Sequence, residues 1–195
     1  MTGFLPLFIL FLRKDTYIGI DRKNYMALTI TAQIISIASM VIMVFSFQMK
    51  RNRYLFAMQI AASVGFAVSY FMLGSPIGAM FNIGGMLRCI AFSIPKLKNK
   101  YGVLFILELY FIVVTFFTYG GLISLFLLAA QLVSTYFMWM DNGKLIRVSL
   151  VCYVSPVWLI NNIIVGSIGG VLCETFNIIS ILVSFARYGL SGFEK

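Results

Sequence analysis

Three ionisable side chains interrupt long apolar runs of this 195-residue sequence: Arg88, Glu108 and Glu174. If these runs cross a bilayer, a charge near its centre costs about 2.5 to 3.5 kcal/mol even on the insertion scale, so each such residue is a candidate for a functional site. Glu174 shares a helix face with Asn177, three residues later. We therefore predict a ligand-binding role for Glu174, with proton coupling as a further hypothesis. The role of Glu108 stays open.

Amide and aromatic side chains lie in the same apolar runs. Buried amides bridge membrane helices, so each one alone also fits a structural role. Arg88 either extends toward the inner headgroups or lines the inner side of a cavity. Amide and carboxylate groups beside an aromatic platform suit a polar, hydroxylated or cationic small molecule. The predicted substrate site comprises Asn82, Asn177, Glu174, Trp158, Asn162 and Arg88.

The composition excludes several kinds of chemistry. The chain has no histidine, which removes Ser-His-Asp catalysis and histidine metal sites. Cys89, Cys152 and Cys173 are isolated within apolar runs, so we expect buried packing residues. A paired-aspartate membrane protease would need two intramembrane aspartates, and Asp141 is predicted to lie in a loop. We expect no enzyme activity, no cofactor and no metal.

The apolar composition indicates a membrane protein. Of the residues, 61% are hydrophobic and 11% are charged, against about 25% charged residues in soluble domains. Since about 20 apolar residues span a bilayer as a helix, we predict an all-α protein with seven transmembrane helices. They cover Ala27–Phe47, Tyr54–Leu73, Pro76–Ile94, Gly102–Phe117, Leu122–Met140, Val148–Val165 and Ser167–Phe185.

Charged and uncharged joints alternate between these segments, and this alternation predicts the orientation in the membrane. Basic residues follow the first, third, fifth and seventh segments, whereas the joints at Gly74–Ser75, 118–121 and Gly166 have no charge. Because Lys and Arg of short loops stay on the cytoplasmic side, we expect the amino terminus outside and the carboxyl terminus in the cytoplasm. The net charge of +9 therefore indicates topology, and we expect no nucleic-acid partner.

The first 25 residues do not fit this pattern. The apolar stretch 3–12 is too short to span a bilayer, and four basic residues of the segment would lie outside. An interfacial or signal-like segment is one interpretation. We favour another, in which the amino-terminal extension, 1–26, ends at Met26 and Met26 is the natural start, with residues 1–25 upstream of it.

Two stretches of the sequence look alike. Gly74-Ser75 and Gly166-Ser167 each precede a helix that begins with a small-residue motif, and Phe66 and Tyr70 align with Trp158 and Asn162. Small residues at these positions favour close helix packing. We predict two triple-helix units, 27–95 and 121–188, joined by a linker helix, 101–118, and followed by a cytoplasmic tail, 189–195. Such a 3+1+3 parallel repeat is the plan of SWEET transporters.

The segments Trp158-Leu-Ile-Asn-Asn162 and Gly166-Ser-Ile-Gly-Gly170, followed by Glu174, resemble the carboxyl-terminal signature of the bacterial inner-membrane YgjV family. The resemblance runs from about Met26 to the end. It implies a plan similar to SWEET and PQ-loop transporters, in which an Asn of the third helix of each repeat contacts substrate. Asn82 and Asn177 are the matching positions. The motif has a glycine three residues after the Asn, which Asn82 has in Gly85 and Asn177 lacks, and the Pro-Gln pair of PQ-loop proteins is absent from the sequence.

Two functions remain open from the sequence. The first is a carrier for a sugar or another polar metabolite in the inner membrane, working by alternating access. The second is a non-transporting membrane protein that packs lipids or a protein partner. Convergence of Asn82 and Asn177 on one cavity would favour the first function, and amides buried against other helices would favour the second. Membrane lipids are expected partners in both cases.

Overall fold

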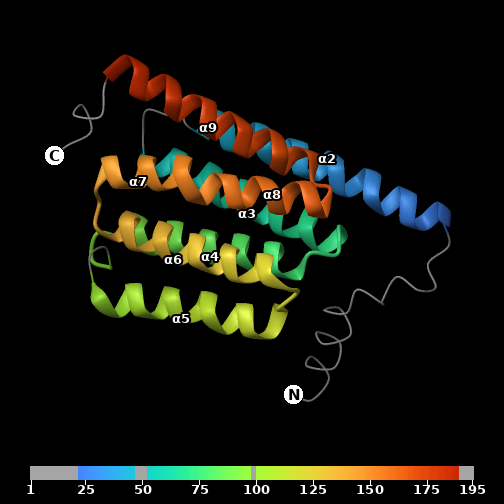
Figure 1. Ribbon diagram of the computed structural model, residues 1–195, viewed down its shortest axis with the longest axis horizontal. Coiled ribbons are helices and arrows are strands. Elements are labelled where there is room, and N and C mark those ends of the chain that lie inside the picture. The colour runs from blue at the N-terminus through green and yellow to red at the C-terminus, as the bar shows by residue number, and fades with distance from the viewer. Residues whose placement is uncertain (1–21, 47–51, 98–99, 189–195) are drawn as a thin grey trace.

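The computed structural model describes residues 22–46, 52–97 and 100–188, and their regular structure is entirely helical (Figure 1). A π-helical segment, η2, joins α7 to α8, so that these three elements form one continuous rod. The helices are α2 (Arg22–Ser46), α3 (Asn52–Met72), α4 (Pro76–Ser93), α5 (Tyr101–Thr118), α6 (Leu122–Trp139), α7 (Gly143–Ser149), η2 (Leu150–Val154), α8 (Ser155–Val165) and α9 (Ile168–Tyr188).

Each of the seven predicted segments coincides with one of these rods, but two predicted starts are wrong. The first rod begins at Arg22 and not at Ala27, so it includes the last residues of the expected extension. The sixth rod begins at Gly143 and not at Val148. Asn142 Oδ1 accepts hydrogen bonds of 3.1 Å from the backbone nitrogens of Lys144 and Leu145, so the amide caps the helix five residues before its apolar run. Residues 1–21 and 189–195 lie outside the described part of the chain. These ranges include most of the expected extension, 1–26, and the whole expected tail, 189–195.

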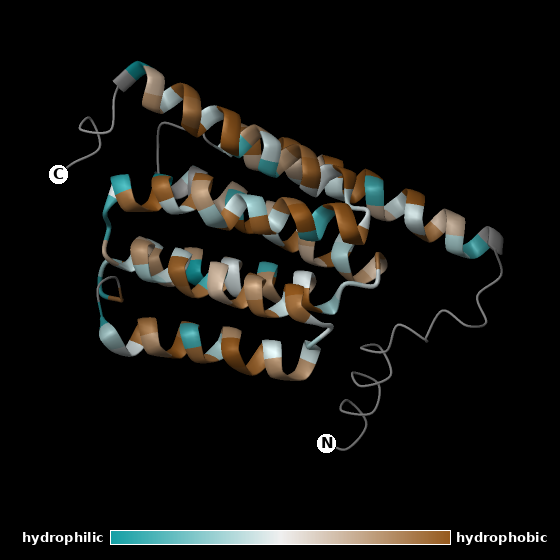
Figure 2. Cartoon of the chain, in the orientation of Figure 1, coloured by the Kyte–Doolittle hydropathy of each residue, from teal (hydrophilic) through white to brown (hydrophobic). Residues whose placement is uncertain are grey.

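Apolar residues run along the described helices (Figure 2), and many large ones are exposed. Five of the helices are long and apolar enough to cross a membrane: α2, α5, α6, the α7–α8 rod and α9. The exposed residues include Phe105, Phe116 and Phe117, each with more than 60% of its surface accessible, whereas Ser36 and Ser69 are fully buried. Large apolar side chains outside and small polar ones inside are typical of helices packed within lipid.

The rods are arranged as two rows that close into a ring. The first row is α2, α3 and α4, and the second is α6, the α7–α8 rod and α9, each helix packing on the next. The rows meet where α2 contacts α9 and where α4 contacts α6. Helix α5 packs on α4 and α6 and lies at one edge of the ring (Figure 1). Chain connectivity alone therefore does not determine the ring, because α2 and α9 come from opposite ends of the sequence.

The hairpins that precede α4 and α9 have the same geometry. Gly74 and Gly166 adopt left-handed φ values of 74° and 76°, which glycine reaches at helix ends without a steric penalty. In the first hairpin the nitrogen of Ser75 donates to the carbonyl of Tyr70 at 2.8 Å. The corresponding bond of the second hairpin, from Ser167 to Asn162, is 2.9 Å long. Corresponding residues are 92 positions apart, the separation of Tyr70 and Asn162.

A glycine one turn into each following helix packs against the helix before it. A Cβ at Gly78 would lie 2.9 Å from the Tyr70 ring, and one at Gly170 would lie 2.6 Å from the Asn162 amide carbon. Both glycines therefore permit a close approach that alanine would obstruct. This is the packing role predicted for the small residues after Gly74 and Gly166.

Candidate functional site

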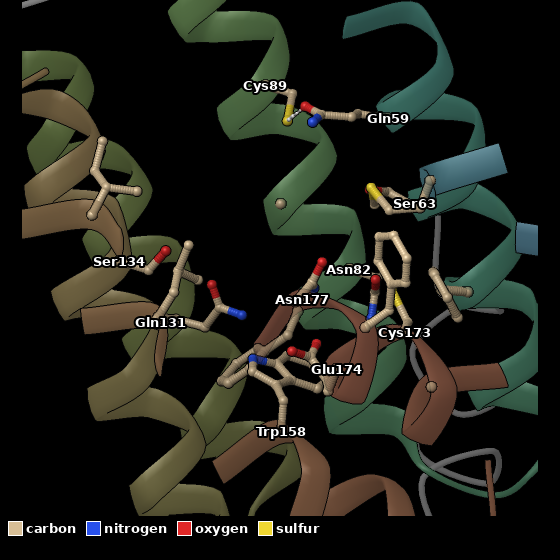
Figure 3. Close-up of a pocket in the computed structure, with 18 of the residues that line it drawn as sticks. Gln59, Ser63, Asn82, Cys89, Gln131, Ser134, Trp158, Cys173, Glu174 and Asn177 are labelled. Atoms are coloured by element: carbon tan, nitrogen blue, oxygen red, sulfur yellow. Dashed lines mark hydrogen bonds between the residues drawn. The ribbon is translucent and has the colours of Figure 1, made fainter. Parts of the chain in front are cut away.

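A cavity of about 610 Å³ lies at the centre of the ring (Figure 3). Its described lining comes from both rows, α2, α3 and α4 on one side and α6, α7, η2, α8 and α9 on the other, with no residue of α5. Ligand pockets of proteins measure about 300 to 1,000 Å³. The cavity is thus large enough for a small metabolite.

All six residues predicted for the substrate site line this cavity: Asn82, Asn177, Glu174, Trp158, Asn162 and Arg88. Figure 3 shows Asn82, Glu174 and Asn177 near one another, above Trp158. Glu108 is outside the lining. It lies half-buried on α5.

The hairpin end of the cavity is closed by buried side chains. Tyr70 Oη donates a hydrogen bond to Asn162 Oδ1, joining α3 to α8. The Trp158 ring centroid lies 6.0 Å from that of Tyr70 and 6.4 Å from that of Phe81. Exposure is 2% for Tyr70, 1% for Asn162 and 1% for Phe81. At the other end the lining reaches half-exposed Arg147 of α7 and Ser184 of α9. The cavity therefore extends toward the end with the charged joints.

Arg88 connects the two rows through α6. Its Nη1 atom donates to Gln131 Oε1 at 3.3 Å, to Ser134 Oγ at 3.2 Å and to Thr135 Oγ1 at 3.1 Å. Within the described residues, Arg88 Nε has no hydrogen-bond partner. These contacts favour the interpretation in which Arg88 lines the cavity over extension toward headgroups. The guanidinium joins α4 to α6 and still presents unused donor capacity.

Glu174 lies beside Ser155 of α8 and Asn177 of its own helix. Asn82 Nδ2 donates to the Gly78 carbonyl at 2.8 Å, so one end of this amide serves its own helix. The hairpin spacing aligns Asn82 with Glu174, whereas Asn177 aligns with Gly85, one turn farther from the hairpin. The pairing of Asn82 with Asn177 inferred from the sequence therefore differs from the pairing that the hairpins give.

Several contributing residues escaped the sequence interpretation. Ser134 and Thr135 bind Arg88 but were not expected at the site. Their spacing of three and four residues after Gln131 places all three on one helix face, a signal that could have grouped them. Tyr70 was aligned with Asn162 as part of a repeat, and the two side chains contact each other directly.

A π-helical turn, η2, precedes Pro156 at the start of α8. The backbone nitrogen of Ser155 donates to the carbonyl of Leu150, five residues earlier. Proline supplies no backbone donor, and a wider turn adjusts the preceding hydrogen bonds. This turn lies next to the cavity, because Leu150 and Trp158 both line it.

The described residues contain no cluster of three metal-ligating side chains. Cys89 and Cys173 are buried in the cavity wall, and Cys152 is exposed, contrary to the expectation that all three would be buried. Cys89 Sγ lies 3.8 Å from Gln59 Oε1, within range of a weak hydrogen bond. These thiols supply no metal site in the described part of the chain.

Comparison with known proteins gives one match. The sequence model of the family Imp-YgjV, described as bacterial inner membrane protein, matches residues 30–191. No curated protein and no solved structure matches the chain. The matched region contains the whole cavity lining. The chain, with its apolar helices, therefore belongs to the Imp-YgjV family of bacterial inner membrane proteins.

Proposed function

We propose that the chain is a carrier that moves a small polar molecule across the inner membrane by alternating access. The observation that supports this most directly is the shared cavity. Side chains of both rows, including Asn82 and Arg88 of α4 and Glu174 and Asn177 of α9, line one space at the centre of an apolar bundle. Charged groups within a membrane are costly, so their presence marks a functional site or a pathway.

The proposed plan has seven membrane spans in a 3+1+3 arrangement, with α5 as the linker. Its support is the correspondence of the rows. Each row packs in chain order, and each ends against the first helix of the other, α4 on α6 and α9 on α2. The two hairpins agree in φ and in hydrogen bonds. Two units in the same orientation can rock about a site between them.

The charged joints predict which side the cavity faces. The joint before α5, helix α7 and the carboxyl end of α9 lie at one end of the bundle, at the left in Figure 1. These segments contain Lys96, Lys100, Arg147 and Arg187. Because basic residues stay in the cytoplasm, that end is inside, and the amino terminus of α2 is outside. The structure then corresponds to a carrier open toward the cytoplasm. The Tyr70–Asn162 contact forms the closed periplasmic gate, and the π-helical turn before Pro156 is the proposed hinge.

Uptake by the purified full chain in liposomes tests the proposal. The solutes are a panel of radiolabelled sugars, nucleosides, amines and amino acids. Gly85 lines the cavity, and a Cβ there meets nothing within 4 Å, so Gly85→Trp should fill the cavity and abolish uptake. Gly102→Trp is the matched control, because Gly102 is equally open but lies on α5 outside the cavity. It should transport as the wild type does.

Absence of uptake across the whole panel, with the fold intact, would contradict the carrier and favour the non-transporting function. Equal uptake by the wild type and Gly85→Trp would contradict the central site. The proposal includes no catalytic step.

A further inference from the structure

Two side chains that can carry opposite charges, Arg88 and Glu174, line the cavity without pairing with each other. Arg88 donates from Nη1 to three neutral acceptors on α6, and the neighbours of Glu174, Ser155 and Asn177, are neutral as well. No described residue forms a salt bridge with either of them. An ion removed from bulk water without an opposite charge is costly. A ligand that brings both a positive and a negative group would compensate both charges at once.

The two charges lie at different depths. Each position is counted from the matched turn before its helix, at Gly74 for α4 and at Gly166 for α9. Glu174 is eight residues beyond its glycine, and Arg88 is fourteen residues beyond its own. At 1.5 Å per residue, the six-residue difference offsets the two positions by about 9 Å along the bundle. Arg88 is the one nearer the charged joints.

A ligand that meets both side chains carries an ammonium group at one end and a carboxylate at the other, each able to form a charge-assisted hydrogen bond of about 2.8 Å. An α-amino acid is a small polar molecule of this kind. A guanidinium is also the side chain best suited to binding a carboxylate through two parallel hydrogen bonds.

We infer that the central cavity takes an amino-acid zwitterion, with its ammonium group at Glu174 and its carboxylate at Arg88. The inference rests on the proposed carrier function and names its substrate class. By the same residue count Asn82 is level with Glu174, and Asn177 lies between Glu174 and Arg88. Both amides line the cavity and supply neutral donors and acceptors. Arg147 lies at the mouth of the cavity, where its Nη1 donates to the Gly143 carbonyl at 3.0 Å. It adds positive charge on the path that a carboxylate would follow.

Binding to the purified full chain tests this inference. The thermal shift is measured with each of the common L-amino acids and with glucose. The amino acid with the largest shift is then compared with its decarboxylated amine and its deaminated acid, which keep the side chain and lose one charge each. We expect the zwitterion to bind about 10- to 100-fold more tightly than either analogue, since each loses one charge-assisted contact.

Two charge-neutralising variants assign the ends. Glu174→Gln should reduce the preference for the zwitterion over the deaminated acid about tenfold or more, and Arg88→Gln should do so for the preference over the amine. A purely structural role would weaken all three ligands equally. Glu108→Gln removes a carboxylate outside the cavity and should leave both preferences unchanged. If Arg88→Gln does not fold, because it loses its bonds to α6, Glu174→Gln and Arg88→Lys remain, the latter keeping the charge and the preference.

Equal binding of the amino acid and its two analogues would overturn the inference, as would an unchanged preference in Glu174→Gln or the absence of any shift with amino acids. Binding of the acid alone, or of the amine alone, would also overturn it. Uptake of a sugar that Gly85→Trp abolishes, without a preference for zwitterions, would reject this substrate class and leave the carrier function standing. Failure of all uptake would reject both.

Discussion

The hairpins before α4 and α9 have the same turn but begin their helices differently. At the second hairpin, Gln33 Oε1 of α2 accepts from the nitrogen of Ile168 at 2.9 Å, and Ser36 Oγ accepts from that of Gly169 at 3.2 Å. Gln33 Nε2 also donates to the carbonyl of Gly166 at 2.6 Å. At the first hairpin, α4 begins with Pro76, which has no backbone donor to satisfy. The second hairpin thus depends on a distant helix, and the first is more self-contained.

This difference shows how the ring closes. The seam between α2 and α9 has side-chain hydrogen bonds to backbone, whereas the seam between α4 and α6 is bridged by Arg88 and three side chains of α6. A hydrogen bond to the backbone at a helix start has few alternative partners, whereas a hydrogen bond between side chains of two helices can be replaced by another. We therefore expect the α2–α9 seam to be the firmer one.

The largest effect is expected at Gly169. A Cβ there would lie 2.6 Å from the backbone nitrogen of Ile37 and closer still to the Ser36 carbonyl. Since backbone cannot move aside as a flexible side chain can, Gly169→Ala should destabilise the protein by about 3 kcal/mol, measured by SDS unfolding in mixed micelles. Gly85→Ala has open space around its Cβ and is the control. Similar stability of the two variants would contradict a close α2–α9 seam.

A smaller loss is expected from Gln33→Met, which keeps the side-chain length and removes both hydrogen bonds to the second hairpin. Interhelical hydrogen bonds in membranes contribute about 0.6 kcal/mol on average and up to about 1.7, so the loss should be about 1 to 2 kcal/mol in the same assay. Pro76→Ala alters the first hairpin and should cost only about 0.5 kcal/mol. If Pro76→Ala proved the more damaging change, the two hairpins would not differ as described.

Tyr70→Phe removes a single hydrogen bond, where Gln33→Met removes two, so its expected loss of stability is the smaller, about 1 kcal/mol. It leaves Asn162 Oδ1 without its tyrosine donor at the closed end of the cavity. We expect several-fold faster labelling of a cavity cysteine from the hairpin side in this variant. Stability lost without any change in labelling would indicate that the contact is structural and is not a gate.

Much of this fold follows from length and hydropathy. The helices and the turns between them could be predicted, because a bilayer requires about 20 apolar residues per helix and because glycine at positions 74 and 166 marks two of the turns. The start of α7 at Gly143 could not be predicted, since the cap from Asn142 extends this helix into polar sequence. The closure of α2 on α9 depends on contacts between residues more than 130 positions apart, such as Gln33 and Gly166, which no local pattern records.

The candidate site was predictable to the extent that its residues are costly in a membrane. Arg88 and Glu174 stand out in an apolar sequence for that reason, and the amides do so more weakly. Ser134 and Thr135 do not, because hydroxyls in membrane helices bond to their own backbone at little cost. Their role depends on the position of the Arg88 guanidinium group, which only the packing of α4 on α6 determines.

Cysteine labelling from both sides of the membrane tests alternating access most directly. In a variant without Cys89, Cys152 and Cys173, single cysteines are placed by Gly85→Cys in the cavity, Gly102→Cys at the charged end and Gly120→Cys at the hairpin end. A membrane-impermeant maleimide is applied to vesicles of either orientation. The account predicts that Gly102→Cys reacts from the cytoplasm, Gly120→Cys from the periplasm, and Gly85→Cys from both. Reaction of Gly85→Cys from one side only, with both controls as stated, would contradict it.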